Sequence, residues 1–196
     1  LALPFLEPIF QKRPFILGAQ DCASEIRGAL TGEVSAADLK SLGAKYVILG
    51  HSERRGSLGE TSALVALKAV AAVKAGLAPI ICVGERAAEK KAGKTESFLK
   101  EELRASLKGY PSGSGPLFVA YEPVWAISTN RGAKPLSPAE AALIHDYIKK
   151  EAAKLTKRPV RVLYGGSVDE DNAAGFLAEK DIDGLLVGGA SLEAVR

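Results

Sequence analysis

The sequence predicts a single α/β domain, residues 1–196, in which parallel strands alternate with helices, and three observations support this prediction. Short apolar runs, each long enough for a buried strand, recur at residues 15–19, 46–50, 79–84, 117–120, 160–164 and 184–188. Longer amphipathic segments lie between or after them, at residues 36–42, 61–75, 95–107, 138–155 and 171–178. Polar or glycine-rich residues come directly after each apolar run. Strict alternation favours a parallel sheet, either an open sheet or a closed barrel.

Composition narrows the class of protein. Of 196 residues, 47% are apolar and 25% charged, which is ordinary for a soluble enzyme. The net charge of +3 is spread along the chain and does not indicate a nucleic-acid or membrane surface. The two cysteines, Cys22 and Cys82, lack metal-ligand spacing and suit a reducing compartment. No apolar run approaches the ~18 residues of a membrane span, and no signal segment opens the chain. We therefore expect a cytoplasmic protein without a metal site.

The individual elements carry recognisable signals. The predicted strands are mostly apolar on both faces, as parallel strands covered by helices should be. Gly76 ends the helix at residues 61–75, and the next strand begins directly after it. Ser137 precedes Pro138, and Glu140 lies three residues after Ser137, which together form a capping box at a helix start.

Glu122 is the first candidate functional residue. It follows an apolar strand and stands beside Tyr121, Val124 and Trp125, the only tryptophan. Apolar surroundings destabilise an ionised carboxylate and move its proton affinity toward the range useful to a general base. The alternative is a carboxylate that caps the strand end or pairs with an arginine.

His51 is the second candidate. It follows the strand at residues 46–50 and precedes a polar segment at residues 52–55. Backbone N–H groups at a helix start disfavour an imidazolium, so we expect a neutral His51 that donates a hydrogen bond to a carbonyl. A structural turn residue is an equally good alternative. The other histidine, His145, lies within a helix and is expected to be structural or exposed.

Strand ends carry the remaining signals. Gln20, His51, Glu85 and Glu122 each follow a predicted strand, as do two Gly-rich turns at residues 165–167 and 188–191. Sites built from many strand ends at one face are typical of the (β/α) barrel, which favours the barrel over the open sheet. Both turns precede helices, so their N–H groups suit a phosphate. The alternative is that the glycines only permit tight turns, but two such turns favour phosphate binding.

Several motifs resemble the triosephosphate isomerase family. They lie at residues 28–35, 50–55, 81–85, 120–127, 164–168 and 183–192, in the family's order, and the resemblance extends from about Pro4 to the last residue. It implies a (β/α)8 TIM barrel, usually a homodimer, that interconverts dihydroxyacetone phosphate and D-glyceraldehyde 3-phosphate. The reaction is a proton transfer through an enediolate in glycolysis and gluconeogenesis, and it needs no cofactor or metal. A Glu base with a neutral His is an established pairing in that family.

The resemblance also implies roles for individual residues. Glu122 resembles the base, His51 the electrophile that polarises the carbonyl, and Glu53 a buried carboxylate beside an active-site lysine. The implied phosphate donors are Ser128, Ser167, Gly188 and Gly189. The implied lid hinge is Pro123, Val124 and Trp125, and Tyr164 resembles the residue that latches the lid. Residues 20–31 resemble a loop that inserts into a neighbouring subunit, with Thr31 near that subunit's site.

Two departures from the family pattern stand out. After Ile127 the family usually reads Gly-Thr-Gly-Lys, whereas this chain has Ser128 and then Thr, Asn and Arg. Serine still offers its N–H to phosphate but is more restricted than glycine. The family's first strand, which ends in an Asn-x-Lys motif, has no counterpart in this sequence. We therefore expect a barrel that lacks the first β–α unit and part of the last helix in this chain.

Three functions remain open from the sequence. The first is the isomerase. The second is a catalytically impaired or inactive barrel that binds phosphate ligands or a partner chain. The third is another phosphate-binding barrel enzyme that acts on a different sugar phosphate. The presence of both Glu122 and His51 favours the first over the second, and the length of the motifs disfavours the third.

Overall fold

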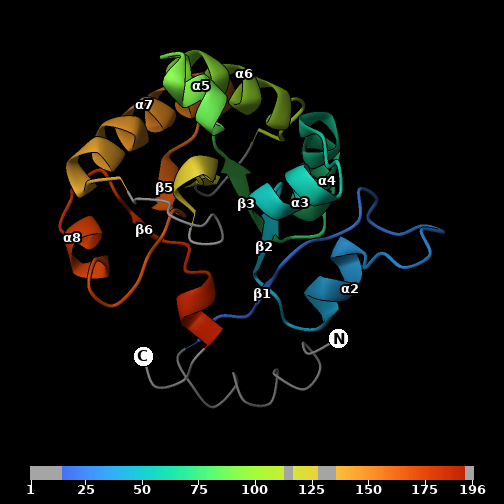
Figure 1. Cartoon of the computed structure of the whole chain (residues 1–196). Helices are drawn as coiled ribbons and strands as arrows, with labels where there is room; N and C mark the ends of the chain where they lie inside the picture. Colours follow the sequence, from blue (N-terminus) through green and yellow to red (C-terminus); the bar gives the residue numbers. More distant parts are fainter. Residues whose placement is uncertain (1–14, 113–116, 128–135, 193–196) are drawn as a thin grey trace.

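The computed structural model describes residues 15–112, 117–127 and 136–192, and within them a six-stranded parallel sheet forms the centre of the molecule (Figure 1). The strands follow the chain order β1-β2-β3-β4-β5-β6, and every neighbouring pair is parallel. They are β1 (Gly18–Ala19), β2 (Tyr46–Leu49), β3 (Ala78–Val83), β4 (Leu117–Tyr121), β5 (Val160–Tyr164) and β6 (Gly184–Leu185). A sheet in which each strand pairs with the next along the chain is the pattern of a (β/α) barrel.

Helices lie outside the strands in Figure 1 and connect each strand to the next. The α-helices are α2 (Ala36–Ser41), α3 (Ser52–Ser57), α4 (Ser62–Lys74), α5 (Ala87–Lys91), α6 (Thr95–Ser106), α7 (Pro138–Thr156) and α8 (Ala173–Leu177). Two short 3₁₀ helices, η1 (Val124–Ala126) and η2 (Gly189–Leu192), follow β4 and β6. The predicted α/β fold of the barrel type is therefore confirmed, with six strands of it in the described residues.

The sequence signals for the start of one helix and the end of another are found in the structure. The Ser137 hydroxyl accepts a hydrogen bond from the Glu140 N–H at 3.3 Å, and the Glu140 carboxylate accepts one from the Ser137 N–H at 3.1 Å. This capping box, with Pro138 at the first helical position, starts α7. Gly76 has a φ of +82° just after α4, a conformation that glycine adopts without strain.

The two edge strands are shorter than predicted. The apolar runs at residues 15–19 and 184–188 form ladder pairs only at Gly18–Ala19 and Gly184–Leu185. Phe15 and Ile16 are 61% and 62% exposed, so these side chains are not part of the core. Each edge strand has one hydrogen-bonded neighbour within the described residues. A strand paired on one side only keeps fewer of its residues in the ladder than a strand paired on both sides.

The core lies between the sheet and the helices outside it. Leu49, Ile81 and Val119 of neighbouring strands are fully buried, as are Leu99 of α6 and Ile148 of α7. The parallel register aligns Val83 with Tyr121 and Tyr121 with Tyr164, so the carboxyl ends of β3, β4 and β5 lie at one level. Residues that follow these strands are therefore brought to the same face of the sheet.

His145 of α7 is a buried part of this core. It is 0% exposed, and its ring packs edge-on against Tyr121 and tilted over Tyr164, with ring centroids 6.0 and 6.2 Å apart. In the described part of the chain neither ring nitrogen makes a hydrogen bond of good geometry. Burial, followed by the nearby Lys149, lowers the pKa of His145 to about 4, although Asp183 and backbone groups of Asp181 and Val162 oppose this. The imidazole is therefore neutral in the folded protein at pH 7.

The lowered pKa of His145 predicts a loss of stability in acid. The unfolded chain binds this proton near pH 6.5 and the folded chain only near pH 4, so the stabilising contribution is complete above pH 6.5 and is lost as pH falls through that interval. We expect the free energy of unfolding to fall by roughly 3 kcal/mol from this group between pH 7 and pH 4. Urea unfolding of the wild type and of His145→Phe at several pH values measures it as the difference between the two curves. Equal losses of stability in both proteins would show that His145 does not cause the effect.

Candidate active site

Glu122 directly follows β4, and the residues after the neighbouring strands β3 and β5 lie against it. Its N–H donates to the Val83 carbonyl at 2.8 Å, and the residue is 3% exposed. Glycine is required at two neighbouring positions, because a Cβ on Gly84 would lie 1.7 Å from the Glu122 carbonyl oxygen and one on Gly165 2.9 Å from its Cγ. The chain after β3 and after β5 thus packs against Glu122 so closely that no residue larger than glycine fits at positions 84 and 165.

His51 lies beside this carboxylate. Gly50, with a φ of +72°, turns the chain out of β2, and His51 then caps the start of α3. Its Nε2 is 3.0 Å from Oε1 of Glu122, and the Ser52 N–H donates to Oε2 at 2.9 Å. Both carboxylate oxygens of Glu122 are therefore held by residues at the start of α3, and the structure brings together the two residues that the sequence proposed as base and electrophile.

Two opposing influences act on the His51 imidazole. The Glu53 N–H donates to Nδ1 at 3.4 Å, which leaves the proton of a neutral ring on Nε2, toward Glu122. This is the helix-start effect that the sequence predicted. The hydrogen bond to Glu122, however, raises the pKa of His51, and partial burial opposes it only in part. The sequence did not reveal this second influence, because residues 51 and 122 are distant in the chain.

The expectation that Glu53 is buried is wrong. Its side chain is 70% exposed, and its one ion-pair contact within the described ranges is with Nδ1 of His51, 3.9 Å away. Position 53 lies in the first turn of α3, where its side chain faces solvent. The neighbouring Arg54 is paired with Asp21 at 2.8 Å and with Glu60 at 3.3 Å.

The predicted lid hinge contacts the buried carboxylate of Glu85 through Trp125. Pro123 is buried, and Val124 and Trp125 open the 3₁₀ helix η1. The Trp125 indole N–H donates to Glu85 Oε1 at 2.9 Å, and the Tyr121 hydroxyl lies 3.2 Å from both oxygens of this fully buried carboxylate. Lys90 lies over the Trp125 ring, 5.1 Å from its centroid. The sequence placed Glu85 at a strand end but did not identify it as the anchor of this segment.

Tyr164, the predicted latch, is fully buried and stacks on Phe176 with ring centroids 4.1 Å apart. Burial raises the pKa of its hydroxyl to about 12, although the backbone of Leu136, just beyond the predicted lid, opposes the shift. Among the residues described, that hydroxyl has no hydrogen-bond partner. The nearness of Leu136 therefore suits a latch without forming a hydrogen bond in this conformation.

The predicted phosphate donors are only partly assembled. The Ser167 N–H donates to the Ala126 carbonyl at 3.1 Å, so in this conformation it is occupied by the residue that follows the predicted hinge. Gly188 and Gly189 are exposed, and a Cβ at either position would meet no atom within 4 Å. They follow β6, which pairs with the strand that precedes Ser167. Ser128 lies outside the described residues.

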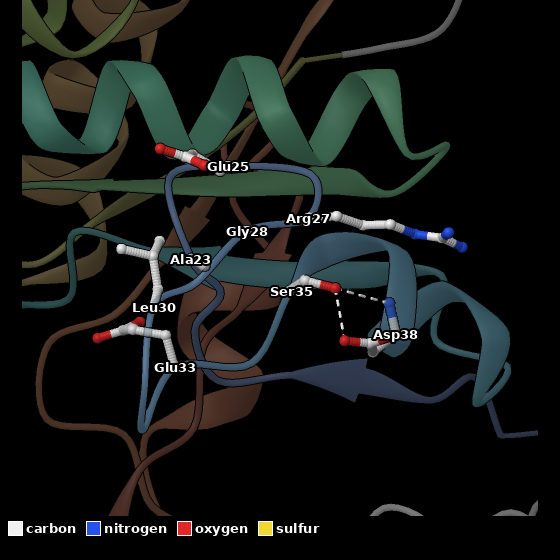
Figure 2. Close-up of a pocket in the computed structure, with 8 residues that line it drawn as sticks. All are labelled: Ala23, Glu25, Arg27, Gly28, Leu30, Glu33, Ser35 and Asp38. Carbon is white, nitrogen blue, oxygen red and sulfur yellow. Dashed lines mark hydrogen bonds between the residues drawn. The ribbon is translucent and has the colours of Figure 1, made fainter.

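A cavity of about 350 Å³ lies elsewhere, in the loop between β1 and α2 (Figure 2). Its lining includes Glu25, Arg27, Glu33 and Asp38, and none of the candidate catalytic residues. Thr31, the predicted contact to a neighbouring subunit, is exposed in the same loop. The described residues contain no cluster of three or more His, Cys, Asp or Glu side chains suited to a metal ion, and no helix long and apolar enough to cross a membrane.

Comparison with known proteins gives one family. A family model described as triosephosphate isomerase matches residues 2–196. Triosephosphate isomerase from Delftia acidovorans is 48% identical over 180 residues, which cover 91% of this chain and 71% of the relative. That from Herpetosiphon aurantiacus is 48% identical over 194 residues, or 96% of this chain and 76% of the relative. A crystal structure of triosephosphate isomerase from Bartonella henselae superposes with a TM-score of 0.84 at 37% identity and covers 99% of this chain and 78% of that one.

The geometry predicts that the pKa values of the two histidines are shifted in opposite directions. We expect His51 to titrate above pH 6.5 and His145 near pH 4 in the wild type. In Glu122→Gln the charged acceptor is gone while partial burial remains, so the pKa of His51 should fall and that of His145 should stay the same. An NMR titration of the imidazole signals measures both, with His145 as the internal control. If His51 titrated at the same pH in both proteins, the hydrogen bond to Glu122 would not be what shifts it.

Proposed function

The chain belongs to the triosephosphate isomerase family, and we propose that Glu122 and His51 interconvert dihydroxyacetone phosphate and D-glyceraldehyde 3-phosphate by proton transfer. The observation that carries the proposal is the buried Glu122 carboxylate with His51 Nε2 at 3.0 Å. A base and a hydrogen-bond donor so close together can act on adjacent atoms of one small substrate. This is the arrangement needed to remove a proton from carbon while the neighbouring carbonyl is polarised.

The reaction follows from these two groups. Glu122 takes a proton from C1 of dihydroxyacetone phosphate, and the electron pair of the C–H bond moves to form the C1–C2 double bond of an enediolate. The Nε2–H of His51 donates to the C2 oxygen, where negative charge develops. Glu122 then returns a proton to C2, and a proton shift between the two oxygens completes the aldehyde. His51 must turn from Glu122 to the substrate oxygen, so substrate replaces the contact seen in the free protein.

The phosphate group would bind the Gly-rich turns. Gly188 and Gly189 are exposed at the start of η2, and glycine lets an anion approach the backbone closely. Ser167 would contribute its N–H after releasing the Ala126 carbonyl, and Ser128 would contribute a further one. A lid that begins at Pro123, Val124 and Trp125, latched by Tyr164, would exclude water from the enediolate. Movement of the lid and release of Ser167 are then one event, because Ala126 is part of the lid segment.

The setting of the reaction is also proposed from the family. We expect a cytoplasmic enzyme of glycolysis and gluconeogenesis that acts as a homodimer, with Thr31 near the site of the neighbouring subunit. Residues 25–31 of the loop at residues 20–31 are exposed and support this assignment, because they include Ile26 and Leu30 at 37% and 38% exposed. Sedimentation equilibrium tests it, and a monomer at micromolar concentration would contradict it.

Replacing the base should abolish turnover without abolishing phosphate binding. Glu122→Gln keeps the shape of the side chain but removes its basicity, so we expect kcat to fall by at least ~10²–10⁴-fold. Inorganic phosphate should still bind with near wild-type affinity, because the Glu122 side chain is not among its proposed donors. A coupled isomerase assay and calorimetry with phosphate measure the two quantities. Near-complete activity in Glu122→Gln would remove Glu122 from the base position.

The reciprocal variant is Gly189→Val. A Cβ added here meets no atom within 4 Å, so folding should be unaffected while the valine side chain blocks the anion's approach. Phosphate affinity and kcat/KM should both fall. The matched control is Gly56→Val in α3, another glycine at which an added Cβ would meet no atom within 4 Å, and it should leave phosphate affinity unchanged. Unchanged phosphate binding in Gly189→Val would place the anion elsewhere.

A further inference from the structure

Arg55 is a nearly buried arginine that contacts four different elements. Its side chain is 14% exposed, although it belongs to the short helix α3. Nε donates to the Gly50 carbonyl at 2.7 Å, and one terminal nitrogen donates to the Ser62 hydroxyl at 2.9 Å. The other terminal nitrogen donates to the Cys82 carbonyl and to the Ser106 hydroxyl, both at 3.1 Å. The guanidinium thus joins the ends of β2 and β3 to α4 and α6.

Glu102 of α6 continues this connection. Its side chain is 10% exposed, and Oε1 lies 3.5 Å from Arg55. Oε2 accepts a hydrogen bond from the Gly84 N–H at 2.9 Å. Burial raises the pKa of Glu102, while Arg55 and the Gly84 N–H oppose that shift by stabilising the carboxylate. Glu102 therefore fixes the residue that follows β3.

Each member of this pair is linked to a proposed catalytic residue through a glycine of its own. Arg55 holds the carbonyl of Gly50, and the peptide that begins with this carbonyl contains the nitrogen of His51. Glu102 holds Gly84, which lies so close to Glu122 that a Cβ would stand 1.7 Å from the Glu122 carbonyl oxygen. One path leads to the electrophile and the other to the base. Neither Arg55 nor Glu102 contacts the carboxylate or the imidazole directly.

We propose that Arg55 and Glu102 form a nearly buried positioning pair that sets the distance between His51 and Glu122. This inference rests on the proposed function and names two residues on which its geometry depends. The pair acts through backbone groups at the ends of β2 and β3, and it contacts no reacting atom. Small errors in the relative position of catalytic groups are costly, because a displacement of about 1 Å can lower the rate ~10²-fold.

The chemistry of the pair makes arginine specifically necessary. The planar guanidinium holds its donors in a fixed fork, whereas a lysine ammonium is a compact charge with three donors on a flexible stem. Arg55→Lys therefore keeps the charge opposite Glu102 but cannot keep all four hydrogen bonds. Glu102→Gln keeps an oxygen for the Gly84 N–H but removes the charge. A variant that removes only Arg55 leaves a buried carboxylate unpaired, so removing both partners should harm the protein less than the two single effects added together.

The test compares Arg55→Lys, Arg55→Met, Glu102→Gln and the double variant Arg55→Met/Glu102→Gln in the full chain. Matched controls are Arg104→Met and Glu101→Gln, exposed residues of the same helix α6. For folded protein, verified by circular dichroism and thermal unfolding, we expect kcat of Arg55→Lys to fall by ~10- to 100-fold. KM should change by less than about twofold, because the phosphate donors lie on other strand ends. Both controls should keep wild-type kcat.

A second readout does not depend on activity. In ¹⁵N-labelled wild type, the Nε2–H of His51 donates to Glu122 and should give a distinct imidazole signal, which Arg55→Lys and Glu102→Gln should shift or broaden. If the wild-type chain turned over no triose phosphate, the proposed function would fail, and this signal would still decide the positioning role. Should Arg55→Met not fold, the lysine and glutamine variants decide. The proposal is overturned if these folded variants keep both the wild-type imidazole signal and, where the wild type is active, wild-type kcat.

Discussion

The described structure depends on the contact between the buried carboxylate of Glu122 and the residues at the start of α3. A carboxylate that is 3% exposed needs hydrogen-bond partners, and here they are Nε2 of His51 and the Ser52 N–H. Glu122 follows β4 and His51 follows β2, so the contact crosses the end of β3. It forms only because β3 is followed by Gly84, whose missing side chain lets the Glu122 backbone pass. The missing side chain of Gly84 is thus one condition for the close approach of the two reactive groups.

Charged side chains bind both backbone groups of Gly50, the turn residue that precedes His51. The Gly50 N–H donates to Glu60 at 3.1 Å, and the Gly50 carbonyl accepts from Arg55 at 2.7 Å. Glu60 is in turn paired with the nearly buried Lys68 at 2.5 Å, and Lys68 also contacts Asp21 at 2.7 Å. Burial acts to raise the pKa of Glu60, but the paired charges outweigh it and lower that pKa. Buried charges of this kind stabilise a structure only while every partner is present, and they therefore define one geometry for the turn.

Local sequence signals predicted most of the helices and strands. The features that they missed depend on contacts between residues that are distant in the chain. The limits of β5 and the capping box at Ser137 follow from apolar pattern and side-chain chemistry alone. The helix α5 is too short to show a periodic pattern and was not predicted, and of α3 only a helix start after His51 was expected. The site residues His51 and Glu122 were found from their places at strand ends, whereas the burial expected of Glu53 was wrong because side-chain direction within a short helix depends on its packing. Arg55 also contacts Cys82 and Ser106, which are 27 and 51 residues away in the chain. Glu85 likewise contacts Tyr121 and Trp125, 36 and 40 residues away, and no local pattern reveals such contacts.

In the proposed mechanism Glu122 moves a proton on one face of the substrate while His51 holds the oxygen. Exchange of hydrogen between D₂O and C1 of dihydroxyacetone phosphate, followed by ¹H NMR, measures this step directly. A single base on one side of an enclosed site predicts that one of the two C1 hydrogens is replaced by deuterium, at a rate similar to turnover, while the other remains. Absence of exchange above the buffer rate, or equal replacement of both hydrogens, would contradict this mechanism.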